Sequence, residues 1–168
     1  GIDDLRMIVL NRKKRLPIWA DNETQKRLLK CFDYIFEQTS ESVYPPILEM
    51  NSIKQKTKIQ GPGGSICFEA IRVSHGSIDA LGFKIGSIAY IPDVLEIYKN
   101  SKSLISNLQY LIIDALRYRP HPSHAHVEKT LAWVNEFKPR QTILTNMHND
   151  LDYQTLQSET AENVTPAY

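Results

Sequence analysis

The sequence has no hydrophobic run long enough to cross a membrane. A transmembrane helix needs about 20 consecutive apolar residues, and no stretch of this 168-residue chain approaches that length. The opening residues Gly-Ile-Asp-Asp have neither the basic start nor the apolar core of a signal peptide. We therefore expect no membrane partner and predict a cytoplasmic location.

Cysteine is scarce, and the chain has almost no charge excess. Cys31 and Cys67 are too few for a disulfide framework, and each lies in an apolar pattern that predicts a small core residue. The formal net charge of +1 offers no broad basic surface for nucleic acid. The basic run from Arg12 to Arg15 fits either a phosphate-facing patch or the solvated end of a helix. We therefore do not expect a nucleic-acid partner.

What the chain does have is enough apolar sequence for one domain over residues 1–168, since 42% of its residues are hydrophobic. Apolar periodicity predicts helices over residues 2–14, from Asn22 onward, over 127–137 and over 152–158. The helix from Asn22 has Gln25 in capping-box position. Strands are predicted over 16–20, 66–73, 81–85, 88–91, 111–115 and 142–145. Strand–helix–strand order in the second half predicts a layered α/β fold.

Two glycine-containing segments and one polar stretch connect these elements. Residues 60–65 lack the Lys-Ser/Thr ending of a phosphate-binding loop and precede no helical pattern, so they predict a hairpin turn. Gly86-Ser87 predicts a second hairpin. The polar stretch to about residue 58 predicts a loop with short edge strands.

The histidines point to chemistry, because none of the five occurs in the first 74 positions and all follow or end predicted strands. The strand-end candidates are His75, Asp93, His121, His124, His126 and His148. Side chains at strand ends can converge on one edge of a sheet. Imidazole together with carboxylate suits Zn²⁺ or Mn²⁺. The alternative is that these are ordinary loop histidines.

Several segments together resemble one family. They are Val73-Ser74-His75-Gly76, Ile88-Ala89-Tyr90-Ile91-Pro92-Asp93, Asp114-Ala115-Leu116-Arg117, Pro120-His121-Pro122-Ser123-His124 and Ile143-Leu144-Thr145-Asn146-Met147-His148. This set resembles the metallo-β-lactamase-fold hydrolases, and within them the phosphoribosyl 1,2-cyclic phosphate phosphodiesterases. The resemblance spans nearly the whole chain and implies an αββα sandwich.

The resemblance implies a set of metal ligands. His75 would bind one metal, Asp93 would bridge two metals, and His148 would bind the second metal. Relatives have the last ligand histidine directly after Leu-Thr, where this chain has Asn146. Residues two apart on a strand point the same way, so His148 could take the place that Asn146 does not fill.

The resemblance also implies roles around the substrate. His124 would bind the phosphate and protonate the leaving oxygen, which histidine can do because it titrates near neutral pH; the alternative is a cap of the following helix. Arg117 would contact the phosphate, although a surface salt bridge is an equal reading. His121, like His126, would either neighbour the phosphate or hold the local structure. Asp114 would support a histidine from behind or would bond a loop.

The implied reaction is phosphodiester hydrolysis by a hydroxide held between two divalent ions, Zn or Mn. The substrate would be a small cyclic phosphate or a nucleotide-like phosphodiester, and a homodimer is compatible with the family. The family's His-x-His-x-Asp-His motif does not occur in the chain. Without it each metal has two protein ligands, fewer than the three of a catalytic zinc site. We therefore expect a C-terminal portion of the fold, incomplete at its N-terminus, which by itself binds metal weakly and does not turn over.

Two other functions stay open at this point. One is processing of the 3′ end of tRNA, an activity of relatives with this fold. The sequence shows no long basic arm that would bind tRNA. The other is a non-catalytic remnant that binds nucleotides, which the Asn146 replacement would favour.

Overall fold

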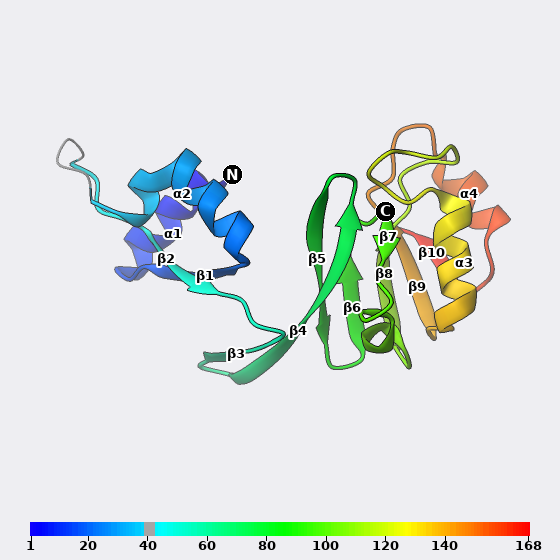
Figure 1. The fold of residues 1–168 in the computed structure, drawn as a ribbon, viewed down its shortest axis with the longest axis horizontal. Helices are drawn as coiled ribbons and strands as arrows, with labels where there is room; N and C mark the ends of the chain where they lie inside the picture. Colours follow the sequence, from blue (N-terminus) through cyan, green and yellow to red (C-terminus); the bar gives the residue numbers. More distant parts are fainter. Residues whose placement is uncertain (39–42) are drawn as a thin grey trace. The chain divides into compact units, whose positions relative to one another are not determined.

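The computed structural model describes residues 1–38 and 43–168 of the chain. These residues divide into two compact units, Gly1–Lys54 and Gln55–Tyr168. Each unit has its own cluster of buried apolar side chains. The single domain that the sequence predicts stays a prediction, and each unit is described by itself (Figure 1).

Unit 1 combines two helices with a small parallel sheet. Its elements are a 3-10 turn at Ile2–Asp4, α1 (Leu5–Arg12), β1 (Leu16–Ala20), α2 (Asn22–Phe36) and β2 (Leu48–Ser52). β1 and β2 pair in parallel. The buried cluster is Val9, Ile35, Phe36, Ile47 and Leu48. The predicted strand over 16–20 and the helix starting at Asn22 are confirmed.

The residue that caps α2 differs from the expectation. The cap is Asp21, whose carboxylate accepts a hydrogen bond from the backbone N–H of Thr24 at 2.8 Å. Asp21 has the extended backbone that a capping residue needs, whereas Asn22 is already helical. Gln25 donates from its side-chain amide to the carbonyl of Ala20 at 2.8 Å. The capping-box pairing of Asn22 with Gln25 is therefore wrong, although the helix start is right.

Unit 2 is one mixed sheet with helices between its later strands. Its elements are β3 (Lys56–Gly61), β4 (Gly64–His75), β5 (Ile78–Ile85), β6 (Ile88–Ile91), β7 (Glu96–Ile97), a 3-10 turn at Lys102–Ile105, β8 (Tyr110–Asp114), α3 (Val127–Phe137), β9 (Gln141–Thr145), α4 (Tyr153–Glu159) and β10 (Val164–Pro166). The strand order is β10-β9-β8-β6-β5-β4-β3, and β7 also pairs with β4. The predicted α/β class is confirmed.

Both predicted hairpins form, and so do strands within the polar stretch. β3 and β4 join at Gly61 and Gly64, and β5 and β6 join at Gly86-Ser87. The short edge strands expected in the polar stretch are confirmed: β2 lies within it, and β3, the end strand of its sheet, begins there. Residues 39–42 of the stretch lie outside the described part of the chain. Cys31 and Cys67 are exposed. The prediction that they are core residues is therefore wrong.

The core of unit 2 lies between the sheet and its helices. Ile91, Leu111 and Ile113 are fully buried on one face of the sheet, where Trp133 of α3 and Leu156 of α4 join the same cluster. In Figure 1 α3 (yellow) lies beside β9 (orange). Burying each large aliphatic side chain contributes about 1.5–3 kcal/mol, so this cluster holds the strands at fixed positions.

No helix among the described residues is long and apolar enough to cross a membrane.

Strand direction brings the chemically interesting residues to one edge of the sheet. β6, β8 and β9 pair in parallel. β4 runs in the same direction as β6, because both are antiparallel to β5. The carboxyl ends of these four strands therefore lie along one edge. At that edge His75 ends β4, Asp93 follows β6, Asp114 ends β8 and Asn146 follows β9.

Candidate metal centre

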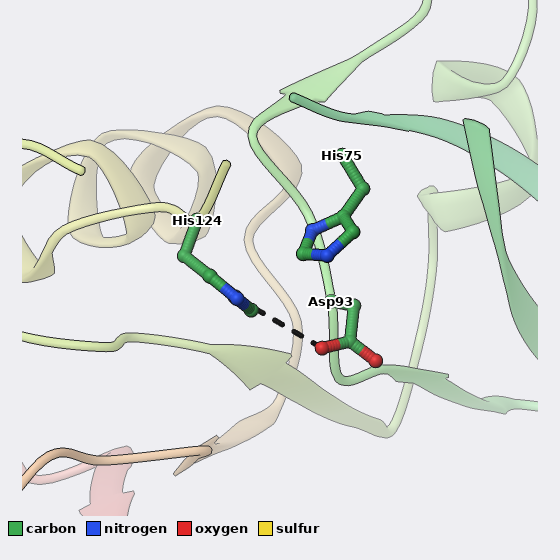
Figure 2. Close-up of side chains that lie close together, drawn as sticks. All are labelled: His75, Asp93 and His124. Atoms are coloured by element: carbon green, nitrogen blue, oxygen red, sulfur yellow. Dashed lines mark ion pairs between the residues drawn. The ribbon is translucent and has the colours of Figure 1, made fainter. Parts of the chain in front are cut away.

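Three side chains converge at this edge. Each of His75, Asp93 and His124 offers one ligand atom such that all three atoms lie within 4.8 Å of one another. Figure 2 shows the two imidazoles and the carboxylate facing a common space. The side chain of Asp93 is 50% exposed and that of His124 is 16% exposed. The group is therefore open to solvent on the Asp93 side and enclosed on the His124 side.

His75 is oriented by a carbonyl from a distant loop. Its Nδ1 lies 2.8 Å from the backbone oxygen of Ser123. A carbonyl only accepts hydrogen bonds, so Nδ1 carries the proton and Nε2 keeps its lone pair for a ligand. The turn after His75 passes close to the same loop, because a Cβ added to Gly76 would lie 3.0 Å from the Cβ of Ser123. The contact thus favours, for the neutral ring, the tautomer that leaves Nε2 free for a metal.

His124 is held by a buried acid. Its Nδ1 lies 2.7 Å from Oδ2 of Asp114, a residue with no exposed surface. The same oxygen accepts the backbone N–H of Val94 at 3.1 Å. Burial raises the pKa of the Asp114 carboxyl, while the hydrogen bonds from His124, Val94 and Asn146 act in the opposite direction. The sequence left Asp114 open between support of a histidine and a loop bond, and the structure shows both.

The nitrogen of His124 that faces Asp93 is already occupied. Nδ1 lies 3.9 Å from Oδ1 of Asp93 (dashed line in Figure 2), but it is much closer to Asp114. With its proton directed at Asp114, Nδ1 has no lone pair for a metal, so only Nε2 remains for ligation or proton transfer. The alternative of a helix cap does not apply to His124, because the cap of α3 is His126.

The loop that carries His121 and His124 is held by Arg117. Its guanidinium donates to the carbonyls of Arg119 at 3.2 Å and Pro120 at 2.8 Å. Nδ1 of His121 accepts from the backbone N–H of Ser123 at 3.3 Å, and its ring lies 5.2 Å from that of His124. Desolvation, followed by the charge of Arg117, lowers the pKa of His121. Both phosphate contacts stay predictions; the structure shows Arg117 bonding its own loop.

His148 does not join the three converging side chains. Its side chain is 51% exposed, and its Nδ1 lies 3.2 Å from a carboxylate oxygen of Asp150. The strand-periodicity argument for His148 fails, because β9 ends at Thr145 and Asn146 has a left-handed backbone with φ of +60°. Its assignment as a ligand stays a prediction.

Asn146 instead faces the buried acid. Its side-chain Nδ2 donates to Oδ1 of Asp114 at 3.2 Å. The sequence treated Asn146 only as a replaced ligand, and it gave no role to the carbonyl of Ser123. The role of Asn146 had a signal in the sequence, because Asn146 directly follows one predicted strand and Asp114 ends another. The role of the Ser123 carbonyl had none, because no side-chain pattern marks a backbone carbonyl.

The donor set fits a divalent transition metal. Two imidazoles and a carboxylate are ligands of zinc-type sites. Nδ1 of each imidazole is hydrogen-bonded, to the carbonyl of Ser123 for His75 and to Asp114 for His124, and such bonds orient histidines in metal sites. Within the part of the chain that the structure describes, this is the one group of three such side chains close enough to share an ion.

Comparison with protein families gives a match over most of the chain. The model of the family described as "Beta-lactamase superfamily domain" matches residues 1–147. These residues span both units and include His75, Asp93 and His124. The match ends just before His148.

Known proteins similar to the chain are longer than it is. The chain is 27% identical over 150 residues to an octanoyltransferase of Porphyromonas gingivalis, of which it covers 29%. A crystal structure titled as a new diphosphatase from the PhnP family matches all of the chain with a TM-score of 0.86 and 26% identity, and the chain spans 63% of it. The Zn²⁺-bound PqqB of Methylobacterium extorquens matches 92% of the chain at 12% identity and a TM-score of 0.62, with 63% of that protein covered, which shows a shared fold.

Proposed function

The chain belongs to the beta-lactamase superfamily, and from this premise we propose that its site hydrolyses a small phosphodiester with a divalent metal ion. The fold is that of metallo-β-lactamase-type hydrolases. The observation that carries the proposal is the convergence of His75, Asp93 and His124 at the carboxyl edge of the sheet. One imidazole and a carboxylate that can bind an ion, with a second imidazole beside them for proton transfer, suit metal-assisted hydrolysis.

His75 and Asp93 are the ligands in this proposal. Ser123 orients His75 so that Nε2 faces outward from its hydrogen bond, and the half-exposed carboxylate of Asp93 is reachable from solvent. A divalent ion held there supplies activation of water and neutralises the charge of phosphate oxygens. Zn²⁺ and Mn²⁺ both suit these ligands.

His124 is the proton donor to the leaving oxygen. Asp114 holds the ring through Nδ1, which leaves Nε2 to donate a proton or hydrogen bond outside the buried pair. A general acid has to lie within hydrogen-bond reach of the oxygen that it protonates. The ring of His124 lies 4.5 Å from that of His75 and in the same group as Asp93, which supports a place for it beside a substrate bound there.

The substrate class is a small phosphodiester, either a cyclic phosphate or the diester of a diphosphate. The similar structure is titled a diphosphatase, and a chain with net charge +1 offers no extended basic surface for a polynucleotide. Since the chain spans 63% of that structure, the activity of the whole protein is a proposal, to which the chain contributes the three converging residues.

The test measures hydrolysis of bis(p-nitrophenyl) phosphate, a cyclic nucleotide and a nucleoside diphosphate diester by the whole protein, with Zn²⁺ or Mn²⁺. We expect metal-dependent release of product from at least one of the three by the intact protein. Bound metal without hydrolysis of any would contradict the proposal. Strong competition by tRNA would favour the tRNA-processing function instead.

The variant His124→Gln separates a proton donor from a ligand. A donor variant keeps its bound metal, measured by elemental mass spectrometry, and loses kcat, with the smallest loss for substrates that have a good leaving group such as p-nitrophenolate. His75→Gln is the comparison, because it removes a proposed ligand and is expected to lose metal. Loss of metal from His124→Gln equal to that from His75→Gln would make His124 the third ligand.

A further inference from the structure

Asn146 lies where a ligand would be expected, yet its contacts are with the acid behind His124. We propose that Asn146 is a positioning residue, whose side-chain amide holds the carboxylate of Asp114 so that Asp114 fixes the ring of His124 with its proton on Nδ1. The expected loss of kcat rests on the proposed function. The hold of Asn146 on Asp114 and the tautomer of His124 do not depend on which substrate is bound.

The geometry divides the carboxylate of Asp114 between its partners. Oδ2 accepts from Nδ1 of His124 at 2.7 Å and from the N–H of Val94 at 3.1 Å. Oδ1 accepts from Nδ2 of Asn146 at 3.2 Å. A carboxylate can accept at both oxygens at once. With Oδ1 held by the amide, Oδ2 stays turned toward His124.

The short contact between the two donors is informative. Nδ2 of Asn146 also lies 3.2 Å from Nδ1 of His124. The amide nitrogen is always a donor, so an unprotonated Nδ1 at this place would accept from it and draw it away from Asp114. A protonated Nδ1 leaves both groups as donors to one carboxylate. The 2.7 Å contact with Oδ2 of Asp114 keeps the proton on Nδ1 and leaves Nε2 free, and the amide of Asn146 acts on this form only through its hold on Asp114.

The backbone explains why asparagine suits this position. Asn146 has φ of +60°, a left-handed conformation that asparagine, aspartate and glycine adopt more easily than other residues. Glycine would keep the backbone but would lack the amide. Aspartate would keep the shape but would place a second carboxylate against Asp114, where like charges repel. Asparagine alone of the three supplies a donor.

The test therefore uses Asn146→Gly and Asn146→Asp. Asn107 is a matched control, because it is another asparagine with a left-handed backbone, φ of +57°, and it precedes the amino end of β8, whereas the converging group lies at the carboxyl ends of the strands. ¹⁵N NMR of the imidazole nitrogens, assigned with His124→Gln, reports the fraction of neutral His124 that carries its proton on Nδ1. We expect that form to dominate in the wild type, in Asn107→Gly and in Asn146→Asp, whose carboxylate would itself accept from Nδ1. We expect it to give way to a mixture in Asn146→Gly.

Kinetics supply the second readout. Removing a residue that orients a site group through a hydrogen bond typically costs about 10–100-fold in activity. We expect that loss in kcat of Asn146→Gly with the bound metal unchanged. Loss of metal with an unchanged His124 tautomer would overturn the proposal and make Asn146 a ligand. An unchanged tautomer with unchanged kcat would also overturn it.

The two proposals fail in different experiments. The NMR measurement is made with and without Zn²⁺ and needs no turnover. If the wild type hydrolyses no phosphodiester but the tautomer shifts in Asn146→Gly, the proposed function fails and the positioning role stands. If the wild type is active and Asn146→Gly keeps both kcat and tautomer, the positioning role fails and the function stands.

Discussion

Unit 1 and unit 2 bury similar kinds of residue but differ in chemistry. Unit 1 surrounds a small cluster of five buried residues with two helices and two strands, and it contains no histidine. Unit 2 has the larger cluster and all five histidines. The comparison teaches that the converging donors need a broad sheet, because several parallel strands have to end at one edge before side chains from distant segments can meet.

The same contrast appears in how the polar groups are held. In unit 2 the donors are supported from other elements: His75 by Ser123 and His124 by Asp114. The polar contacts of Asp21 and Gln25 in unit 1 instead cap a helix and tie it to its neighbouring strands. The polar contacts of unit 1 therefore serve stability alone, whereas those of unit 2 also orient the residues of the candidate site. The following substitutions test that difference.

The largest effect is expected from Asp93→Asn in unit 2. The amide lacks the charge that attracts a divalent ion, and metal-assisted charge stabilisation is worth several kcal/mol, where 4 kcal/mol corresponds to about 1,000-fold in rate. The control in unit 1 is Asp33→Asn, which changes another exposed acid. We expect kcat and bound metal to fall in Asp93→Asn and to stay unchanged in Asp33→Asn. An equal loss in both would remove the distinction between the units.

Core substitutions compare the stability of the two units. Leu111→Ala in unit 2 and Ile35→Ala in unit 1 each open a cavity at a residue with no exposed surface. Such changes cost about 2–5 kcal/mol. Hydrogen exchange followed by mass spectrometry locates the loss of protection. Because each residue packs within its own cluster, we expect the loss in the unit that carries the substitution. A common loss in both units would support the single domain that the sequence predicts.

Two glycine turns sharpen the comparison inside unit 2. Gly76 and Gly86 have φ of +67° and +59°, so alanine costs about 1 kcal/mol of strain at either position. Only Gly76 would also press a Cβ against Ser123, whereas nothing lies within 4 Å at Gly86. We expect both variants to lower the free energy of unfolding, and Gly76→Ala alone to weaken Zn²⁺ binding, measured by calorimetry. Equal Zn²⁺ affinities would exclude the Ser123 contact as support for His75.

The smallest effect is expected at the helix caps, one in each unit. Asp152 of α4 accepts from the backbone N–H and the hydroxyl of Thr155, each at 2.8 Å. Asp21 of α2 accepts from one N–H, that of Thr24. We expect Asp152→Ala to lower Tm more than Asp21→Ala at neutral pH, because two hydrogen bonds are lost instead of one.

The Asp152 effect depends on pH with a definite sign. The hydrogen bonds from Thr155 lower the pKa of Asp152 in the folded protein. The stabilisation is therefore complete above the pKa of the unfolded state and is lost as pH falls through the lower, folded value. The Tm of Asp152→Ala should approach that of the wild type in acid, as followed by circular dichroism. A constant difference down to acid pH would mean that the charge of Asp152 plays no part.

Most of the secondary structure follows from local pattern. The helix over 127–137 and the strand over 16–20 match the structure residue for residue, because apolar spacing reports which side of an element faces the core. The capping of α2 was misplaced by one residue, since Asp21 and Asn22 both favour a cap and only the backbone angles distinguish them.

The cysteines show where local pattern is insufficient. Cys31 and Cys67 stand in apolar sequence, but both are exposed. Cys67 pairs with Lys58 in the β3–β4 hairpin. The periodicity of a strand does not show which of its residues other segments cover. Exposure depends on what other segments cover, and that is a property of the whole arrangement.

The sequence by itself determined the fold class, the family resemblance, and the placing of histidine and aspartate at strand ends, because these depend on residues near one another in the chain. Only the tertiary structure decided which of them meet. His75 finds its support 48 residues away, and Asp114 finds the amide of Asn146 32 residues away, while His148 lies outside the group. Strand order and direction determine which of these residues lie together. The left-handed backbone at Asn146 interrupts the strand spacing from which His148 was expected to reach the site.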